Sequence, residues 1–527
     1  MKVLVTDPIA RDGIEIFEAA GLDVEERPGL SPEEFLEVIQ DADGLVIRSN
    51  TRVTREVVDA SKKLKVVGRA GTGLDNVNIA ACNKRGIVVM NTPGGNTNSA
   101  AEHSIAMIMA LSRHIPQATA SMKSGKWEKK RFSGQEVAGK TLGIIGIGRI
   151  GSIVSQLAQG LKMQVVAFDP HIRPEMAEKL GVELTDLDNV LARADYISIH
   201  APLTAETKRS VNAELFNKMK DGVMVLNCAR GGIIHEQDLY EAMKSGKVAG
   251  AALDVFEAEP TSKEHPLFSL DNFICTPHLG ASTVEAQENV AVAVARQISD
   301  YLTKGEVKNA VNMPSVSGKT LVQLTPILSL ADKLGTFHAY LTTAPLEEVT
   351  VYYQGDIANL DTAPVTISII KGLLSPILSE EVNFVNAPVL AEERGIKVTE
   401  SKSKTSEDFT SLLTVTVKTA DGTNTLAGTI FGKKEPRLVR INNFCLEAVP
   451  EGHMLLIYNQ DRPGVIGRIG ITLGEANINI GQMQVGQDPD HHRNVILLTT
   501  DDSVGPDVLS RLLQEDGVEK AQAIELG

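Results

Sequence analysis

The sequence contains little cysteine and no long apolar run. Four of its 527 residues are cysteines, and Cys82, Cys228, Cys275 and Cys445 form no CxxC pair and no zinc-type spacing. The spacing therefore predicts no metal site, and so few thiols in a long chain favour a reducing compartment. No apolar run approaches the ~18 residues that a spanning helix needs, and the start MKVLVTDPIA leads into no signal-peptide core. These absences predict a cytoplasmic protein.

Positive charge is also in deficit. The chain has 52 basic and 67 acidic side chains, which gives a formal net charge of −15. This balance opposes non-specific binding to nucleic acid or to an anionic membrane. It does not exclude a small anionic substrate, because a local cluster of arginines can reverse the sign of the potential inside a cleft. The length favours three or four domains.

Strand-like and helix-like segments alternate through the first three hundred residues. KVLVTD, GLVIRS, KVVGRAG and GIVVMNTPGGN lie between helical segments, and a second series begins at KTLGIIGIGRIG. This alternation predicts parallel sheets. The apolar stripe over residues 99–118 predicts one long helix. After about residue 318 the composition changes and an α+β domain is expected. From residue 453 a strand-helix-strand-strand-helix-strand order predicts a ferredoxin-like domain.

A glycine-rich loop follows the first strand of the second series. Gly146, Gly148 and Gly151 have G-x-G-x-x-G spacing and open a predicted helix, whose N-terminus attracts a pyrophosphate. The next strand, QVVAFD, ends in Asp169, 18 residues after Gly151, where an acid binds a ribose hydroxyl pair. This arrangement favours NAD over NADP, because the acid repels a 2′-phosphate. A tight turn without nucleotide, with Asp169 as a cap, is the alternative.

Polar side chains follow three later strands of the same predicted sheet. Arg230 follows VLNCA, Asp254 and Glu259 lie in AALDVFEAEP, and His278 ends NFICTPH. The carboxyl ends of such strands meet in one crevice. An arginine grips a carboxylate, and a glutamate beside a histidine raises the pKa of the imidazole so that it can accept a proton. The set suits oxidation of a 2-hydroxy acid, although each residue alone could be structural.

Several longer segments add a family resemblance. GRIG, NCARGG, AALDVFEAEP and PHLGAST resemble motifs of the D-isomer-specific 2-hydroxyacid dehydrogenases, over roughly the first 315 residues. The resemblance implies that Arg230 anchors the substrate and polarises its carbonyl, with Glu259 and His278 as a paired acid/base. It also implies that NAD contacts the glycine loop, Arg230 and His278, together with Thr72, Arg149, Ile150, Asp169, Ala201, Cys228, Ala229, Asp254, Gly280 and Ala281.

Further arginines suggest a substrate with a second anionic group. Arg48 and Arg69 end apolar strands, whereas a lactate-sized acid needs only Arg230.

The whole chain is similar to long members of the family with an intervening domain and a C-terminal ACT domain. This resemblance implies oxidation of 3-phospho-D-glycerate to 3-phosphohydroxypyruvate, the first step of L-serine synthesis, by a homo-oligomer such as a tetramer. The chain's departure at His235, where the family commonly has an acid, has no predicted role.

The expected architecture is therefore α/β: two Rossmann-like, doubly wound parallel-sheet domains, then an α+β intervening domain and a βαββαβ ACT domain. The expected limits are 1–97 with 285–315 for the substrate-binding domain, 98–284 for the NAD-binding domain, 318–450 for the intervening domain and 453–527 for the ACT domain.

NQDRPGVIGRIG and ANINI resemble ACT segments, which implies L-serine binding near Asn459, Asp461 and Asn479. A purely oligomerising ACT domain, another 2-hydroxy acid such as glyoxylate or lactate, and a non-catalytic NAD-sensing regulator remain alternatives.

Overall fold

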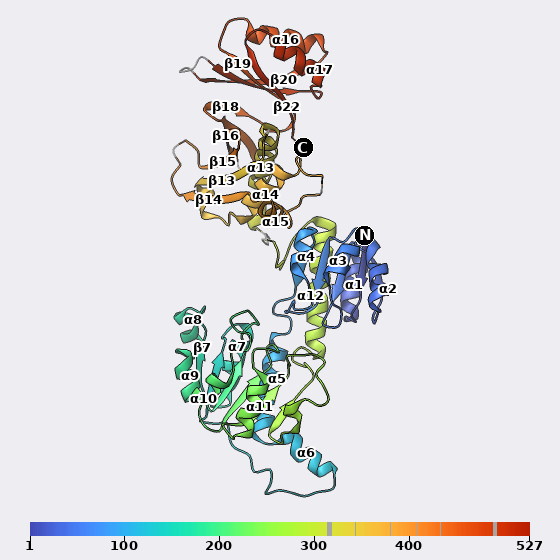
Figure 1. Cartoon of the computed structure of the whole chain (residues 1–527), viewed down its shortest axis with the longest axis vertical. Helices are drawn as coiled ribbons and strands as arrows, with labels where there is room; N and C mark the ends of the chain where they lie inside the picture. Colours follow the sequence, from blue (N-terminus) through green and yellow to red (C-terminus); the bar gives the residue numbers. More distant parts are fainter. Residues whose placement is uncertain are drawn as a thin grey trace.

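A computed structural model describes residues 1–313, 319–342, 344–379, 381–406, 408–432, 434–488 and 493–526. Four sheets lie one after another along an extended molecule (Figure 1). The second sheet lies at one end, the first sheet follows, and the third and fourth sheets occupy the other end. The predicted fold class is confirmed. The domain limits stay a prediction, and the limits at 315 and 318 lie outside the described residues.

The first sheet has five parallel strands in the order β2-β1-β3-β4-β5. Its strands are β1 (Lys2–Val5), β2 (Asp23–Glu26), β3 (Gly44–Ile47), β4 (Val66–Arg69) and β5 (Val88–Asn91). The helices around it are α1 (Arg11–Ala19), α2 (Pro32–Val38), η1 (Ile39–Asp41), α3 (Arg55–Ala60), α4 (Ile79–Lys84) and the much later α12 (Val284–Lys304). Val294 and Ile298 of α12 share a core with Val3 and Val88, so the chain returns to this sheet after forming the second one.

The second sheet has seven parallel strands in the order β12-β11-β10-β9-β6-β7-β8. Its strands are β6 (Thr141–Ile145), β7 (Gln164–Phe168), β8 (Glu183–Leu184), β9 (Tyr196–Ile199), β10 (Val223–Asn227), β11 (Val248–Leu253) and β12 (Phe273–Cys275). Its helices are α5 (Thr97–Ser112), α6 (Ile115–Lys123), α7 (Arg149–Gly160), α8 (Pro174–Lys179), α9 (Leu187–Arg193), α10 (Ala213–Lys218), α11 (Glu236–Lys244) and η2 (Pro266–Ser269). The order reverses at β6, and ligands of doubly wound sheets bind beside such a reversal.

The single long helix predicted over residues 99–118 is wrong, because two helices occupy this stretch. α5 ends at Ser112 and α6 begins at Ile115. His114 between them has a left-handed φ of +51°, and Pro116 lies in the first turn of α6. Proline has no N–H to donate to the carbonyl four residues earlier, and its ring clashes with that carbonyl inside a helix, so the helix stops and restarts here.

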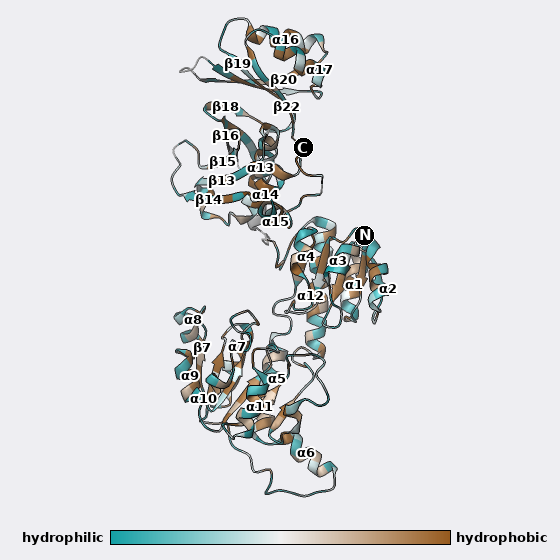
Figure 2. Cartoon of the chain, viewed as in Figure 1, coloured by the Kyte–Doolittle hydropathy of each residue, from teal (hydrophilic) through white to brown (hydrophobic). Residues whose placement is uncertain are grey.

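The third and fourth sheets share a hydrophobic core. The third sheet has the order β14-β13-β15-β16-β17-β18, and the fourth is antiparallel with the order β20-β21-β19-β22. Leu456, Leu497 and Ile524 of the fourth sheet belong to the same buried cluster as Leu334 and Leu438 of the third domain. Figure 2 shows brown, apolar segments alternating with teal, hydrophilic ones along the elements of this half.

The elements of this half are as follows. The third domain contains α13 (Lys319–Leu341), β13 (Leu346–Gly355), η3 (Asp356–Asn359), α14 (Ala363–Leu374), α15 (Ala387–Glu393), β14 (Lys397–Ser403), β15 (Ser411–Thr419), β16 (Gly422–Phe431), β17 (Glu435–Ile441) and β18 (Phe444–Ala448). The fourth sheet's domain contains β19 (Gly452–Gln460), α16 (Val465–Glu475), β20 (Ile480–Asp488), β21 (Arg493–Thr500), α17 (Pro506–Gln514) and β22 (Val518–Leu526).

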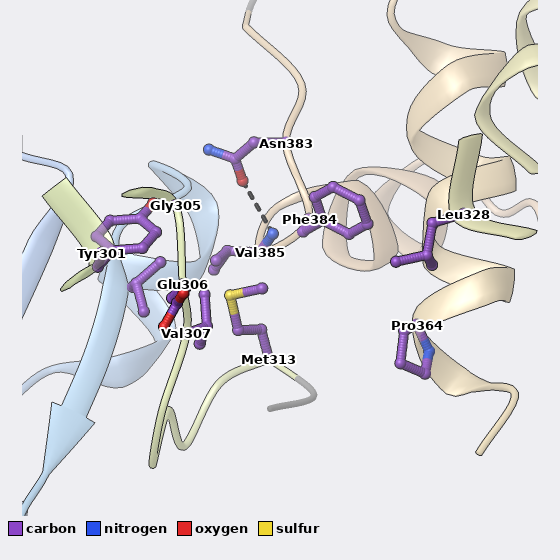
Figure 3. Close-up of a pocket in the computed structure, with 11 residues that line it drawn as sticks. Tyr301, Gly305, Glu306, Val307, Met313, Leu328, Pro364, Asn383, Phe384 and Val385 are labelled. Atoms are coloured by element: carbon purple, nitrogen blue, oxygen red, sulfur yellow. Dashed lines mark hydrogen bonds between the residues drawn. The ribbon is translucent and has the colours of Figure 1, made fainter. Parts of the chain in front are cut away.

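The junction between the first sheet and the third domain is narrower than the core shared by the third and fourth sheets. Val385 is buried in the core of the first sheet, and Asn383 donates a hydrogen bond to the carbonyl of Gly86 at 2.9 Å. Beside them lies an apolar cavity of about 200 Å³, with Tyr301 on one side and Phe384 on the other (Figure 3). Across the described ranges, no helix is both long and apolar enough to cross a membrane.

Candidate active site

Two clefts lie between the first and second sheets, and they meet at His278. The larger cleft, of about 1060 Å³, is lined by the Arg48, Arg69 and Glu259 side of the site. The smaller, of about 440 Å³, is lined by Arg230 and by most of the residues predicted to contact NAD. His278 lines both clefts, as do Asp254 and Ala281. The geometry therefore places the predicted imidazole where two different ligands could meet.

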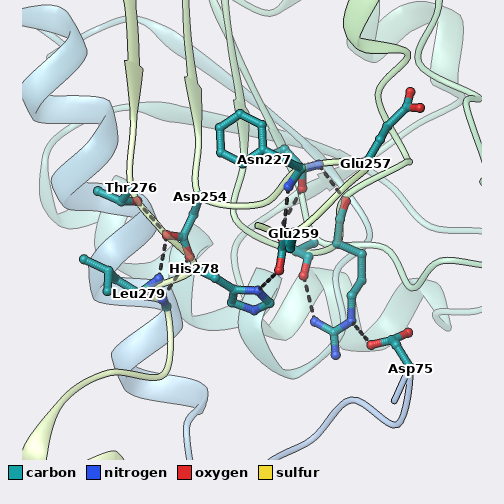
Figure 4. A network of polar contacts seen from close by, with 12 residues as sticks. Asp75, Asn227, Asp254, Glu257, Glu259, Thr276, His278 and Leu279 are labelled. Carbon is teal, nitrogen blue, oxygen red and sulfur yellow. Dashed lines mark hydrogen bonds and ion pairs between the residues drawn. The ribbon is translucent and has the colours of Figure 1, made fainter. Parts of the chain in front are cut away.

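Glu259 and His278 form a direct pair. The Nδ1 atom of His278 lies 2.7 Å from Oε2 of Glu259, and the other carboxylate oxygen of Glu259 accepts the N–H of Phe256 at 3.0 Å (Figure 4). His278 follows β12 with a left-handed φ of +56°, held by hydrogen bonds from its N–H to the carbonyls of Asp254 and Thr276. Such a backbone is sparsely populated by residues other than glycine, so the surrounding contacts determine it.

The hydrogen bond between Glu259 and His278 shifts their pKa values in opposite directions. The hydrogen bond from Glu259 raises the pKa of His278 above 6.5; burial and the charge of Arg230 oppose this, and the charges of Glu259 and Asp254 add to it. Burial works against ionisation of Glu259, but hydrogen bonds from His278 and the Phe256 amide outweigh it and lower the pKa of that carboxyl. Near neutral pH, Glu259 is therefore an anion that favours the protonated imidazole.

Arg230 is fixed by partners that the sequence interpretation missed. Its Nε donates to Oδ2 of Asp75 at 3.0 Å, and Nη1 donates to the carbonyl of Ala229 at 2.7 Å; Asp75 is labelled in Figure 4. The buried side chain of Asn227 accepts the N–H of Ala229 and donates to the carbonyl of Arg230. A Cβ atom on Gly73 would lie 2.1 Å from Nη2 of Arg230, so a side chain at this position would displace the guanidinium.

The glycine loop fits a dinucleotide. Gly146 has a φ of +93°, and a Cβ atom on Gly151 would lie 2.2 Å from the Gly146 carbonyl oxygen. A Cβ atom on Gly148 would meet no atom within 4 Å, and α7 begins just after it without a side-chain cap, so its first N–H groups can bind an anion. The Asp169 carboxylate accepts the N–H groups of Ile147 and His171, which ties the acid to this loop.

The remaining residues predicted to contact NAD surround the smaller cleft. Lining it are Thr72, Arg149, Ile150, Ala201, Cys228, Ala229, Arg230, Asp254, His278, Gly280 and Ala281. Burial raises the pKa of the Cys228 thiol to about 12, which agrees with a small packing residue rather than a nucleophile. Burial lowers the pKa of His200, which also lines the cleft, to about 4, so its imidazole is neutral.

Asp254 anchors the loop that carries His278. Its carboxylate is buried and accepts hydrogen bonds from Thr276 at 2.5 Å and from the N–H groups of Leu279 and Gly280 at 2.7 and 2.8 Å (Figure 4). Burial opposes its ionisation, but hydrogen bonds, the first of them from His103, lower the pKa of Asp254. The turn after β12 is therefore held on both sides of the imidazole.

Three arginines line the larger cleft, and Arg48 and Arg69, the two candidate substrate-binding residues, are among them; the third is Arg52. Burial, then the charge of Arg230, lowers the pKa of Arg69 to about 10; Arg48 acts in the same direction, while Asp75 and Asp7 oppose. The Nε atom of Arg69 is buried and has no hydrogen-bond partner among the described residues. Asp7 is also buried, and it accepts the N–H of Arg48 at 2.6 Å. Such a cluster of partly buried positive charges favours the binding of an anion.

The three candidate effector residues do not meet within one chain. Asn459 is paired with Asn494 on the neighbouring strand, and the side chain of Asn494 donates to Asp461 at 2.9 Å. Asn479 precedes the opposite end of β20, because Ile480 is paired with Thr500 and Gln487 with Asn494. The eight residues between these levels span about 26 Å at ~3.3 Å per residue, too far for one small ligand.

His235 has a local structural contact. Its Nδ1 atom lies 2.9 Å from Oδ2 of Asp238, and the same carboxylate oxygen accepts the N–H of Ala213 at 2.9 Å. These contacts join α10 to the first turn of α11. Replacement of the family's usual acid by histidine therefore leaves a paired residue at this position. Among the described residues, no cluster of histidine, cysteine, aspartate and glutamate has the arrangement of a metal site.

The fold and the site define a class of protein. A Rossmann-like sheet with a glycine loop, beside a second parallel sheet and a cleft holding an arginine and an acid–imidazole pair, is the arrangement of the D-isomer-specific 2-hydroxyacid dehydrogenases. The model of the NAD-binding domain of these enzymes matches residues 105–280. Models of the D-3-phosphoglycerate dehydrogenase intervening domain and of the ACT domain match residues 323–442 and 453–517.

Whole-chain comparisons then narrow the class, and the chain belongs to the D-3-phosphoglycerate dehydrogenase family. A D-3-phosphoglycerate dehydrogenase of Archaeoglobus fulgidus is 46% identical, and one of Methanocaldococcus jannaschii is 43% identical, with 100% of both chains covered in each case. The NAD⁺-bound crystal structure of 3-phosphoglycerate dehydrogenase from Entamoeba histolytica is 36% identical, with a TM-score of 0.52 over 60% of this chain and 99% of that one.

Proposed function

We propose that the chain oxidises 3-phospho-D-glycerate to 3-phosphohydroxypyruvate with NAD, the reaction that begins L-serine synthesis. One observation carries this proposal: the His278–Glu259 pair lies where the predicted cofactor cleft meets a second cleft that contains Arg48 and Arg69. The names of the full-length relatives support the same substrate.

His278 removes the proton in this reaction. With Nδ1 directed to Glu259, the Nε2 atom of a neutral imidazole is free to accept the proton of the substrate hydroxyl. The imidazolium that forms is stabilised by the adjacent carboxylate, which is ionised near neutral pH. In the reverse direction the same pair returns the proton to the carbonyl oxygen.

Arginines hold the two anionic ends of the substrate. Arg230 has its Nη2 atom beside Gly73 at the edge of the smaller cleft, where it grips the carboxylate and polarises the reacting carbonyl. Arg48 and Arg69 line the larger cleft and bind the phosphate. A substrate whose two ends bind these arginines has its reacting carbon next to His278, which lines both clefts.

The glycine loop and the smaller cleft hold NAD. Gly146, Gly148 and Gly151, with Arg149 and Ile150 at the start of α7, surround the pyrophosphate, and Asp169 binds the adenosine ribose and disfavours a 2′-phosphate. Bound NAD supplies the acceptor for the hydride that leaves the substrate. The chain's own contribution is to orient the substrate and to exclude water from the narrow cleft.

A matched pair of histidine variants tests the assignment. His278 and His114 both have a left-handed φ, a conformation that asparagine tolerates, so each can be replaced by asparagine with little backbone cost. The variant His278→Asn should lose more than about a hundredfold in kcat, measured by NADH absorbance with 3-phosphoglycerate, and should keep its NAD affinity. The control His114→Asn should retain activity. Near-normal turnover by His278→Asn would remove that residue from the mechanism.

The C-terminal domain binds a small effector, for which L-serine is our candidate, between two copies of the chain. β20 is one of the two edge strands of the fourth sheet. Antiparallel pairing of β20 with its copy would bring Asn479 of a second copy to the level of Asn459 and Asp461, which one chain alone cannot do. Titrating L-serine into the assay tests the site. Inhibition that is lost in Asn479→Ala would support it, and indifference to millimolar serine would leave only an assembly role.

A further inference from the structure

A second acid–imidazole pair lies behind the pair at the site. Glu236 is the first residue of α11, and its Oε2 atom lies 2.9 Å from Nε2 of His265. Their side chains are only 14% and 13% exposed, so solvent screens the contact little. Within the described part of the chain, neither residue lines either cleft. Their partly buried polar contact therefore needs an explanation other than direct contact with a ligand.

The two carboxylates hold consecutive amides of one segment. The Oε1 atom of Glu236 accepts the N–H of Glu257 at 2.5 Å, and Oε1 of Glu259 accepts the preceding N–H, that of Phe256, at 3.0 Å. The other oxygen of Glu259 contacts His278. Glu236 therefore binds the N–H group of residue 257, next to the N–H group of residue 256 that binds Glu259.

His265 holds Glu236 and the same segment together. Its Nδ1 atom accepts the N–H of Leu267 at 3.4 Å, so the proton that it shares with Glu236 is on Nε2. Its ring packs edge-on against the ring of Phe256, with centroids 5.7 Å apart. One imidazole therefore restrains the carboxylate that binds residue 257 and the side chain of residue 256.

Other charged groups surround the pair. The side chain of Glu257 extends from the same segment to Arg209, at 2.6 Å, which anchors the segment from a further direction. His235, which precedes Glu236, is engaged by Asp238 rather than by Glu236. On the side of the active site, the charges of Arg230 and Asp254 act on His278.

We propose that Glu236, held by His265, is a positioning residue for Glu259: it fixes the 256–259 segment so that the Glu259 carboxylate stays against Nδ1 of His278. The inference rests on the proposed roles of Glu259 and His278. It assigns to a residue outside the clefts a defined effect on the proton-transfer step rather than on substrate or NAD binding.

The pH dependence of kcat/KM for oxidation tests the proposal. The acid limb of this profile reports the titration of His278, which must be neutral to accept a proton. In Glu236→Ala the carboxylate of Glu259 is less well held, so the limb should move to lower pH. The kcat should fall between about tenfold and a hundredfold, as for a slightly misplaced catalytic group. The Kd for NAD should stay within about twofold of that of the unaltered protein.

Matched variants separate positioning from a general loss of structure. Glu236→Gln keeps an oxygen that can accept the Glu257 amide and should restore most of kcat. His265→Phe keeps the ring packing but removes the donor, so it should shift the limb in the same direction by a smaller amount; it also serves if Glu236→Ala does not fold. Glu241→Ala changes an exposed acid on the same helix and should leave the profile unchanged.

Glu259→Gln gives the reference shift and distinguishes two failures. If Glu259→Gln leaves the acid limb in place, the proposed acid/base pair is wrong. If Glu259→Gln moves the limb but Glu236→Ala and His265→Phe do not, the pair stands and the positioning role of Glu236 is overturned. A lower melting temperature of Glu236→Ala with an unmoved limb overturns it equally.

Discussion

Arg69 offers a test in which stability and substrate binding should change in opposite directions. Its guanidinium is largely buried at the end of β4, its Nε atom has no partner among the described residues, and Arg230 and Arg48 repel it. We expect Arg69→Met, which removes the charge and keeps much of the side-chain volume, to stabilise the protein without ligand. The same change should weaken the binding of 3-phosphoglycerate, because the proposed function assigns the phosphate to this cluster.

The magnitude follows from the pKa. Burial and the neighbouring arginines lower the pKa of Arg69 from 12.5 to about 10. At 1.36 kcal/mol per unit, the charged form is roughly 3 kcal/mol less favourable here than in water. Replacing a buried charge by an apolar side chain of similar volume should therefore raise the free energy of unfolding by about 1–3 kcal/mol. Loss of a charge-assisted contact to phosphate should raise the KM by about tenfold to a hundredfold.

Thermal unfolding with and without 3-phosphoglycerate, together with steady-state kinetics, measures both effects. Arg55→Met is the control, because Arg55 is 73% exposed in an ion pair on α3 of the same domain. It should change neither the melting temperature nor the KM appreciably. The reasoning is refuted if Arg69→Met melts below the unaltered protein without ligand. It is also refuted if 3-phosphoglycerate stabilises both proteins equally.

Three further outcomes follow from the same structure. Because Glu259 raises the pKa of His278, and the proton acceptor must be neutral, kcat/KM for oxidation should rise with pH through a midpoint above 6.5; a profile with its midpoint at or below 6.5 would contradict this. Asp169→Ala should weaken NAD binding by about tenfold and NADP binding less, as measured by fluorescence titration; equal losses would argue against contact with the ribose. Removing residues 452–526 should expose the apolar face around Leu438 and increase the binding of a hydrophobic dye, whereas unchanged dye binding would mean that the core is not shared.

The sequence predicts those parts of the fold that depend on local pattern. The alternation of apolar strands with helical segments predicts parallel sheets, and the positions of Arg230, Glu259 and His278 after predicted strands predict that they lie in one crevice. The pattern does not predict β2, because its acidic sequence DVEE lacks the apolar run of a buried strand and forms only through pairing with β1. The long helix predicted through Pro116 is wrong because the proline interrupts the helix although the apolar periodicity continues past it.

Contacts between distant segments explain what the sequence does not predict in the site. Asp75 is 155 positions from Arg230, and neither its residue type nor its neighbours indicate that it binds the guanidinium. The Glu236–His265 pair likewise joins α11 to a loop 29 positions away. By contrast, Asn227 immediately precedes the CARGG segment, and a buried amide next to a catalytic turn could have been proposed as a support for it.

The shared core of the third and fourth sheets limits how an effector could alter the active site. The apolar face of the fourth sheet that is not covered by α16 and α17 packs against the third domain, so the two move together unless this core opens. Opening it would expose several leucine and isoleucine side chains, each costing about 1.5–3 kcal/mol, more than a small ligand offers. The narrower junction at Asn383 and Val385 rests on far fewer contacts, next to a cavity of about 200 Å³. If an effector binds the fourth sheet's domain, we therefore expect the displacement that it causes to be concentrated at that junction. There β5 runs from Val88 to Asn91, whose side chain donates to the carbonyl of Thr72 in the smaller cleft.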